Sequence, residues 1–216
     1  MYKYVLFDLD GTLTNPAEGI TNSVVYALKK YEIEVEDKRE LYKFIGPPLI
    51  DSFMEYYGFS KEKAIQAVEY YREYFSVKGL YENKVYEGVK EMLISLKKAG
   101  KSLVIASSKP EKFVKEILRY FDLLKYFDFV AGASMDEKRS SKDAVIAYAM
   151  ENCPEINGST AVMVGDRSHD VLGAKVFGID CIGVLYGYGG KEELKGAGAK
   201  YIAENIQDVY AYILGR

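Results

Sequence analysis

The sequence predicts an α/β fold in which a doubly wound parallel sheet carries a small inserted helical module. Two observations support this prediction. Short apolar runs without polar alternation, the pattern of strands buried on both faces, alternate with segments of helical periodicity. The alternation is interrupted once, between residues 14 and 84, where only helical patterns occur. Strands and helices that alternate along a chain typically form a parallel sheet with helices on both faces.

Six apolar runs predict the strands of this sheet, and small or polar residues follow four of them. In chain order the runs are Tyr4–Leu9, Ser102–Ala106, Phe127–Ala131, Thr160–Val164, Cys181–Leu185 and Tyr201–Ala203. The polar segments read Asp-Gly-Thr, Ser-Ser-Lys-Pro, Gly-Asp and Tyr-Gly-Tyr-Gly. Because ligands of such sheets bind at the carboxyl ends of the strands, these segments predict a functional site at one edge.

Helical periodicity predicts the elements between the strands. Val89, Met92, Leu93 and Leu96 recur at spacings of i, i+3, i+4 and i+7, and Gly100 supplies a stop. Comparable patterns predict helices around residues 113–121, 145–149, 171–177 and 206–214. Each of these helices has an apolar stripe that can cover one face of the sheet.

The segment without strand patterns predicts a separate helical module. Its amphipathic helices span about residues 17–31, 38–44, 49–57 and 60–78. We expect residues 14–84 to form a cap domain over the catalytic edge of the sheet, and residues 1–13 and 85–216 to form the catalytic core. A chain of 216 residues is long enough for one core with a smaller inserted domain.

The composition is that of an ordinary globular protein and excludes several classes. Hydrophobic residues make up 49% and charged residues 28%, which is too apolar for a disordered chain. The net charge of −3 gives a nucleic-acid partner no electrostatic basis. No run approaches the roughly 18 uncharged residues of a membrane span, and Cys153 and Cys181 form no CxxC pair. We therefore expect a cytoplasmic protein with reduced thiols and without nucleic-acid or membrane partners.

Two carboxylates close the first predicted strand. Asp8 and Asp10 lie two positions apart, so they start on the same side of the strand, and Gly11 allows a sharp turn after them. Two like charges this close do not both ionise at low cost. The pattern favours one carboxylate held ionised by a cation and the other available as a proton carrier. A solvated acidic turn is the alternative.

Hydroxyl groups and a lysine follow the next two strands. Ser107 and Ser108 stand at the end of one strand, ahead of Lys109 and Pro110. A hydroxyl beside a helix amino terminus favours an anion site, with a plain helix cap as the alternative. Lys142 opens the helix after the next strand at the same predicted edge. There it could pair with phosphate or remain a surface charge.

A second acidic pair follows the fourth strand of the chain. Asp166 and Asp170 are spaced i, i+4, and with Asp8 they offer oxygen ligands for a hard cation, for which we expect Mg²⁺. His169 is the only histidine. We interpret it as a helix-surface or hydrogen-bonding residue, because acid–base chemistry already has a carboxylate candidate.

In this order the four motifs resemble the haloacid dehalogenase (HAD) superfamily, in the branch of phosphoglycolate phosphatases and bacterial 5′-nucleotidases. The segment Gly183–Gly189 is similar to that branch as well. The resemblance implies a Rossmann-like core with a helical cap. It also implies a Mg²⁺-dependent phosphatase that hydrolyses a small phosphorylated metabolite.

The resemblance also implies a role for each motif. Asp8 would be the nucleophile that forms an aspartyl-phosphate, and Asp10 would be the general acid and base. The phosphate-binding candidates are Thr12, Ser107, Ser108 and Lys142. Mg²⁺ would be held by the Asp8 carboxylate, the Asp10 carbonyl and Asp166, with Asp170 as a direct or outer ligand.

Substrate choice is expected to lie in the cap. The stiff turn at Phe44, Gly46 and Pro47 is a candidate specificity loop, and its apolar character favours a nucleotide or a sugar phosphate. The alternative is a simple helix connector. Further candidates for substrate contact are Asn15, Glu18 and Lys109.

Two other functions stay open at this point, and so does the assembly state. One function is that of a phosphomutase of the β-phosphoglucomutase type, and the other is that of a phospholigand-binding protein without catalysis. Monomer and weak homodimer are both compatible with the sequence.

Overall fold

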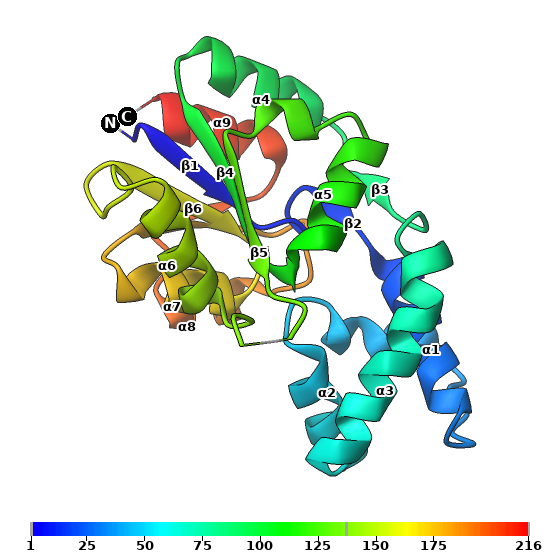
Figure 1. Ribbon diagram of the computed structural model, residues 1–216. Helices are drawn as coiled ribbons and strands as arrows, with labels where there is room; N and C mark the ends of the chain where they lie inside the picture. The colour runs from blue at the N-terminus through cyan, green and yellow to red at the C-terminus, as the bar shows by residue number, and fades with distance from the viewer. Residues whose placement is uncertain (1, 137, 216) are drawn as a thin grey trace. The chain divides into compact units, whose positions relative to one another are not determined.

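The computed structural model describes residues 2–136 and 138–215, and the chain divides into two compact units (Figure 1). One unit comprises Met1–Asn15 and Val85–Arg216, and the other comprises Pro16–Lys84. We refer to them as the core unit and the helical unit. The role of the helical unit as a cap stays a prediction.

The core unit contains a six-stranded parallel sheet with the order β5-β4-β1-β6-β7-β8. Its strands are β1 (Tyr4–Phe7), β4 (Ser102–Pro110), β5 (Phe129–Ala133), β6 (Ala161–Gly165), β7 (Asp180–Val184) and β8 (Tyr201–Ala203). In the centre, Leu6 of β1 lies opposite Val104 of β4 and Met163 of β6, and all three are fully buried. The predicted α/β fold is therefore confirmed.

Helices cover both faces of this sheet, as Figure 1 shows. On one face lie α6 (Lys142–Asn152), α7 (Ser168–Val176) and α8 (Lys191–Ala197). On the other lie α4 (Val89–Lys98), α5 (Glu111–Tyr120), the short turn η3 (Leu124–Tyr126) and α9 (Ile206–Leu214). The α6–α7 face buries Ile146 and Val171 against Leu6 and Val104 of the strands. Burying these apolar stripes holds the strand ends, and hence the polar residues after them, in fixed positions.

Several elements differ from the predicted ones. Strand β5 begins two residues later than expected. The carboxylate of Asp128 accepts hydrogen bonds from the backbone N–H of Leu103 and from the Lys97 ammonium, so this residue caps the strand instead of extending it. Strand β4 continues to Pro110 with an irregularity in register after Ser107. The short helix α8 buries a single leucine, so it has no periodicity to detect. The two-residue strands β2 (Thr14–Asn15) and β3 (Lys84–Val85) form a second sheet and are too short to alternate.

The helical unit contains the helices that the sequence predicts, but two of these segments differ in helix type. Its elements are α1 (Ala17–Lys29), η1 (Lys38–Phe44), α2 (Leu49–Tyr57), α3 (Lys61–Tyr74) and η2 (Phe75–Gly79). The segment η1 is a 3-10 helix whose start is capped by the Asp37 carboxylate, which accepts from the N–H of Arg39. The predicted helix 60–78 ends as an α-helix at Tyr74 and continues as the π-helical turn η2.

The helical unit depends on a close contact between two glycines. A Cβ atom on Gly19 of α1 would lie 1.9 Å from the carbonyl oxygen of Gly79. We expect Gly19→Ala to lower the free energy of unfolding by about 1–3 kcal/mol, because backbone must move to admit the methyl group. Urea unfolding checks this, with Gly196→Ala as the control because nothing lies near a Cβ at that position. Equal stability of the two variants would contradict the prediction.

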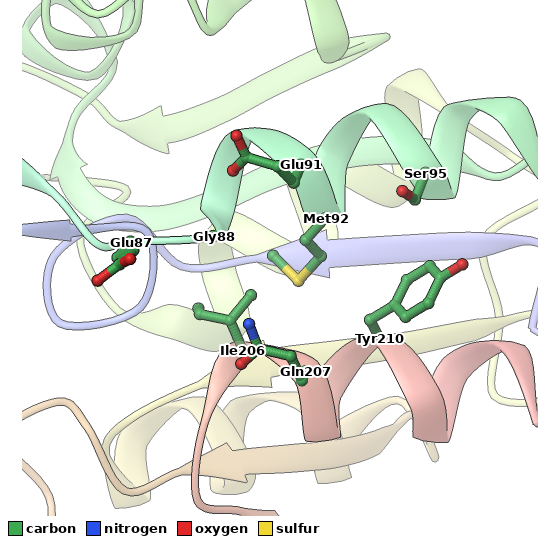
Figure 2. A pocket seen from close by; sticks show the side chains of 8 residues that line it. All are labelled: Glu87, Gly88, Glu91, Met92, Ser95, Ile206, Gln207 and Tyr210. Atoms are coloured by element: carbon green, nitrogen blue, oxygen red, sulfur yellow. The ribbon is translucent and has the colours of Figure 1, made fainter.

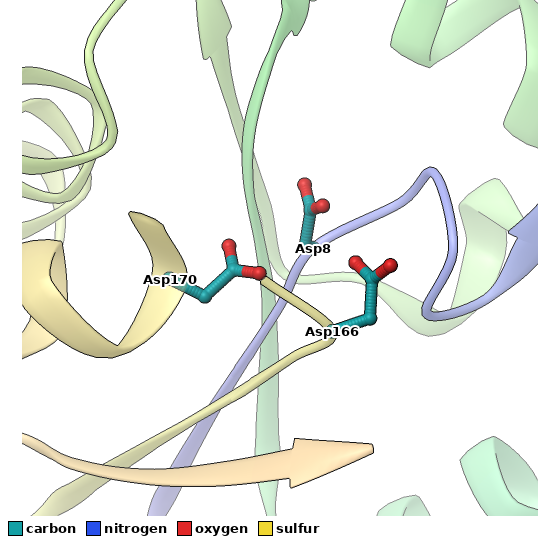
Figure 3. A group of neighbouring side chains, drawn as sticks. All are labelled: Asp8, Asp166 and Asp170. Carbon is teal, nitrogen blue, oxygen red and sulfur yellow. The ribbon is translucent and has the colours of Figure 1, made fainter. Parts of the chain in front are cut away.

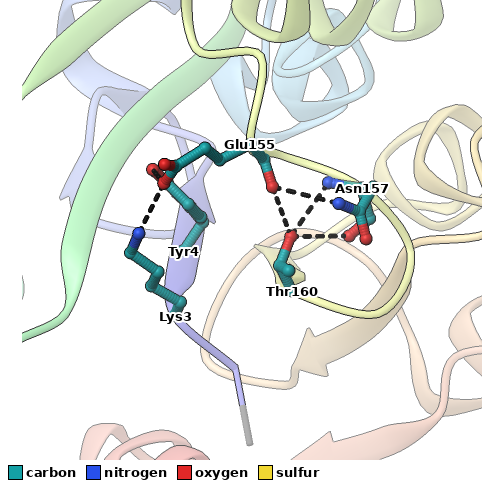
Figure 4. A network of polar contacts seen from close by, with 5 residues as sticks. All are labelled: Lys3, Tyr4, Glu155, Asn157 and Thr160. Carbon is teal, nitrogen blue, oxygen red and sulfur yellow. Dashed lines mark hydrogen bonds and ion pairs between the residues drawn. The ribbon is translucent and has the colours of Figure 1, made fainter.

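A polar network fixes the amino-terminal edge of the sheet, opposite to the predicted site (Figure 4). The Tyr4 hydroxyl donates to the Glu155 carboxylate at 2.5 Å, and the Lys3 ammonium pairs with the same group. The Thr160 hydroxyl donates to the Glu155 carbonyl at 2.6 Å and accepts from the N–H of Asn157. The bonds from Lys3 and Tyr4 hold the pKa of Glu155 below its ordinary value. The network ties the start of β1 to the turn before β6.

The core unit has a cavity of about 450 Å³ between α4 and α9 (Figure 2). Glu87 and Glu91 stand at its rim, and Met92 and Ile206 form its apolar floor. Among the described residues that line it there is no lysine or arginine, so it does not have the charge of a phosphate site. None of the described helices combines the length and apolar content needed to cross a bilayer.

Candidate active site

Three aspartates from separate segments meet at the carboxyl edge of the sheet (Figure 3). Asp8 follows β1, Asp166 follows the adjacent strand β6, and Asp170 lies in the first turn of α7. One oxygen from each lies within 4.8 Å of the others, and all three residues are buried. The structure thus brings together the three carboxylates that the sequence predicts as metal ligands.

The second aspartate of the first motif, Asp10, lies in a tight turn after β1. Its amide groups bond within the turn: the N–H of Gly11 donates to Thr14, and the N–H groups of Leu13 and Thr14 donate to the carbonyl of Leu9. Gly11 has a φ of +85°, and a Cβ atom there would lie 2.2 Å from the Asp166 carboxylate. Glycine is therefore required on both counts.

Lys142 is buried in the middle of the carboxylates. Its ammonium lies 2.9 Å from Asp8 Oδ1 and 2.7 Å from Asp170 Oδ1, and it donates to the carbonyl of Ala106 at 2.9 Å. Burial alone would lower its pKa, but the charges of Asp170 and Asp8 outweigh burial and raise it. The lysine therefore stays charged, and its burial excludes the alternative of an exposed surface charge.

The carboxylates fit a divalent cation. Burial, with the charges of Asp170 and Asp8, raises the pKa of Asp166 well above its ordinary value, and burial also raises the pKa of Asp170. Asp166 Oδ2 accepts the N–H of Tyr188 at 2.7 Å, whereas its Oδ1 is buried without a hydrogen-bond partner in the part of the chain that the structure describes. Clustered hard oxygens, one of them unpartnered, are the donor set that Mg²⁺ prefers.

The raised pKa values give a testable dependence of stability on pH. A raised pKa means that folded Asp166 holds its proton more tightly than unfolded Asp166. In EDTA, its contribution to stability is therefore complete below the ordinary pKa of 3.8 and is lost as pH rises through the folded pKa. We expect Mg²⁺ to stabilise the chain more at about pH 8 than at about pH 5. Melting temperatures check this, and Asp166→Asn should weaken the difference; an Mg²⁺ effect independent of pH would contradict it.

Asp10 lies against Lys109, with Asp10 Oδ2 2.5 Å from the ammonium. Burial raises the pKa of Asp10, and the lysine charge opposes that rise only in part. A carboxyl group with a raised pKa suits a proton carrier. Sequence reasoning proposed Lys109 for substrate contact, whereas the structure places it on the candidate acid.

The phosphate-binding candidates lie on the neighbouring segments. Ser107 and Thr12 are buried, Ser108 is half-buried, and the Thr12 hydroxyl has no hydrogen-bond partner among the described residues. Pro110 rather than a serine is the N-cap of α5, so a plain helix cap does not explain Ser107 and Ser108. His169 is exposed on α7.

The candidates from the predicted cap have mixed positions. Phe44 packs inside the aromatic core of the helical unit, 5.0 Å from Phe53 between ring centres, so the expected direct contact of Phe44 with substrate is not supported. Gly46 and Pro47 are half-buried, and Glu18 is exposed in the first turn of α1. Asn15 belongs to the core unit and accepts from the Tyr188 hydroxyl at 2.6 Å.

Sequence reasoning missed the tyrosines beside the carboxylates. The Tyr186 hydroxyl donates to the carbonyl of Thr12 at 3.2 Å, and Tyr188 contacts both Asp166 and Asn15. Tyr86 packs edge-on against Tyr186, and burial, together with the charge of Asp166, raises the pKa of Tyr86 to about 12. The Tyr-Gly-Tyr-Gly segment at the end of a predicted strand was the available signal.

A parallel α/β sheet with buried aspartates and a buried lysine at its carboxyl edge is an arrangement that suits phosphate chemistry. The model of the haloacid dehalogenase-like hydrolase family matches residues 5–184, and the chain belongs to this family. The predicted resemblance is therefore confirmed, and the chain is a phosphatase of the HAD type.

The similar proteins carry the names of a nucleotidase, a predicted phosphatase and a kinase. The chain is 45% identical over 194 residues to a 5′-nucleotidase of Pseudomonas aeruginosa, covering 90% of this chain and 87% of that protein. The crystal structure of a "predicted phosphatase" from Clostridium acetobutylicum is 53% identical, covers 100% of both chains and superposes with a TM-score of 0.98. Tyrosine-protein kinase PtkA of Mycobacterium tuberculosis is 40% identical over 188 residues, which span 87% of this chain and only 63% of the kinase.

Proposed function

We propose that this chain hydrolyses a small phosphomonoester with the help of Mg²⁺, through an aspartyl-phosphate on Asp8. The observation that supports this most directly is the buried group of Asp8, Asp166 and Asp170, in which Asp8 and Asp170 hold the ammonium of Lys142. The 5′-nucleotidase relative and the apolar turn at Gly46 and Pro47 favour a nucleoside monophosphate as the substrate.

Each residue has a defined task in this reaction. A carboxylate oxygen of Asp8 attacks phosphorus while the bond to the leaving oxygen breaks, and Asp10 gives that oxygen its proton. Water then attacks the same phosphorus, Asp10 takes the proton, and Asp8 is released with inorganic phosphate. The raised pKa of Asp10 suits both proton transfers.

The remaining groups neutralise charge. Lys142 is held by Asp8 and Asp170 where it can meet the phosphoryl oxygens, and Ser107 and Thr12 supply hydroxyl groups. Asp8, Asp166 and Asp170, with the Asp10 carbonyl, would hold Mg²⁺, which supplies positive charge against the phosphoryl oxygens.

Phosphate release from a panel of phosphomonoesters tests the proposal. The panel holds nucleoside monophosphates, phosphoglycolate, sugar phosphates and an aryl phosphate, each with Mg²⁺ and with EDTA. Release that needs Mg²⁺ and is fastest with a nucleoside monophosphate is the expected result. Phosphate that appears on an acceptor sugar instead of in solution would identify a mutase. Binding of phosphate without turnover of any compound would favour a non-catalytic protein.

A further inference from the structure

One short segment after β7 touches three parts of the site. We call residues 186–189, with the sequence Tyr-Gly-Tyr-Gly, the strap. Its Tyr186 hydroxyl bonds to the turn after β1, at the carbonyl of Thr12. Its Tyr188 N–H bonds to the carboxylate of Asp166, and its Tyr188 hydroxyl bonds to Asn15. All of these residues belong to the core unit.

The strap lies directly on Asp166. A Cβ atom on Gly187 would lie 2.4 Å from the Cβ of Asp166 and 2.4 Å from the carbonyl oxygen of Gly11. A Cβ atom on Gly189 would lie 1.9 Å from the backbone oxygen of Asp166. Only glycine allows backbone to approach this closely, so the strap packs directly against Asp166 and Gly11.

The strap also distinguishes the two oxygens of Asp166. Oδ2 is occupied by the Tyr188 N–H at 2.7 Å, which leaves the buried Oδ1 as the oxygen without a hydrogen-bond partner among the described residues. A carboxylate that is held at one oxygen cannot rotate freely. Its other oxygen is therefore directed before any cation arrives, and groups that orient a metal ligand in this way commonly change metal affinity.

The hydroxyl of Tyr188 anchors the strap at its other side. It lies 2.6 Å from Asn15 Oδ1, and it also meets the hydroxyl of Tyr86. Asn15 is the last residue of the core unit before the chain enters the helical unit at Pro16. The carboxylate of Asp166 is therefore connected, through one residue of the strap, to the point where the chain leaves the core.

We propose that Tyr188 is a positioning residue for the cation: its N–H orients Asp166, and its bond to Asn15 keeps that N–H in place. This inference rests on the proposed function, because it takes Asp166 to be a ligand. Loss of the Tyr188–Asn15 bond then weakens Mg²⁺ binding, although neither side chain lies among the expected ligands.

Calorimetric titration of Mg²⁺ into the metal-free full chain tests the inference without any turnover. We expect Tyr188→Phe and Asn15→Ala each to raise the Kd for Mg²⁺ about threefold to tenfold, the effect of one hydrogen bond. The Kd of the double variant should not exceed the higher Kd of the two single variants, because both substitutions remove the same bond. Tyr4→Phe is the matched control, since it removes a tyrosine hydroxyl bond at the opposite edge and should leave the Kd unchanged.

The outcomes separate this inference from the proposed function. If the wild-type chain binds Mg²⁺ and the Kd of each single variant is within twofold of the wild-type Kd, the positioning role is wrong and the proposed function stands. Losses that multiply in the double variant would also overturn it, because the two residues would then act independently. If the wild-type chain does not bind Mg²⁺, both proposals fail.

Discussion

Asp8→Asn is expected to reduce phosphate release by at least about 10⁴-fold, because a neutral amide cannot attack phosphorus. The variant should stay folded. Asparagine has nearly the same shape, and the change removes one negative charge from a buried group in which burial already raises the pKa values of the other carboxyls. Lys142 retains Asp170 as a partner at 2.7 Å.

Phosphate release under saturating Mg²⁺ measures this effect, and urea unfolding reports whether the fold is kept. Asp136→Asn is the matched control, since its carboxylate is an exposed partner of Lys138 and has no role in the proposed reaction. Activity of Asp8→Asn within tenfold of the wild type would show that another group is the nucleophile.

Lys142→Met is expected to have the second largest effect, on stability as well as on activity. Methionine fills a similar volume but leaves the buried carboxylates of Asp8 and Asp170 without their cation. Breaking a buried pair in this way costs about 3–5 kcal/mol in the free energy of unfolding. Activity should fall by about 10²–10³-fold, because the proposed function assigns this charge to the phosphoryl oxygens of the substrate.

Unfolding in urea with EDTA and with Mg²⁺ separates the two contributions. We expect Mg²⁺ to recover part of the lost stability, since it also neutralises Asp8 and Asp170. Lys138→Met is the control, because this lysine is almost fully exposed. A stability loss below about 1 kcal/mol in EDTA would mean that the carboxylates of Lys142→Met are protonated or rearranged instead of left charged.

The sequence predicts those parts of the molecule that depend on regular burial. Strands such as β6 are continuous apolar runs, and Asp8 and Asp166 both follow such runs, so the pattern predicts that they lie at the same edge of the sheet. The burial of Lys142 could not be predicted in this way, because a lysine at the start of a helix is usually exposed. Its burial depends on three partners from three different segments.

Three other contacts of the site escaped prediction for a related reason. Almost any residue at position 188 could donate its backbone N–H to Asp166, so the type of side chain there does not predict this bond. The bond between Tyr188 and Asn15 joins residues that lie 173 positions apart. The pairing of Lys109 with Asp10 depends on the irregular end of β4, which the apolar pattern of that strand does not reveal.

The single lysine among three aspartates also sets an order of events. When the carboxylates are ionised, Asp8, Asp166 and Asp170 together with Lys142 carry a net charge of 1 − 3 = −2. A phosphate dianion that arrives first meets this negative charge at close range in a poorly solvated site. A divalent cation that arrives first makes the group neutral, so that the same dianion is no longer repelled. The proposed function therefore implies ordered assembly, with the metal ion ahead of the substrate and phosphate leaving before the metal ion.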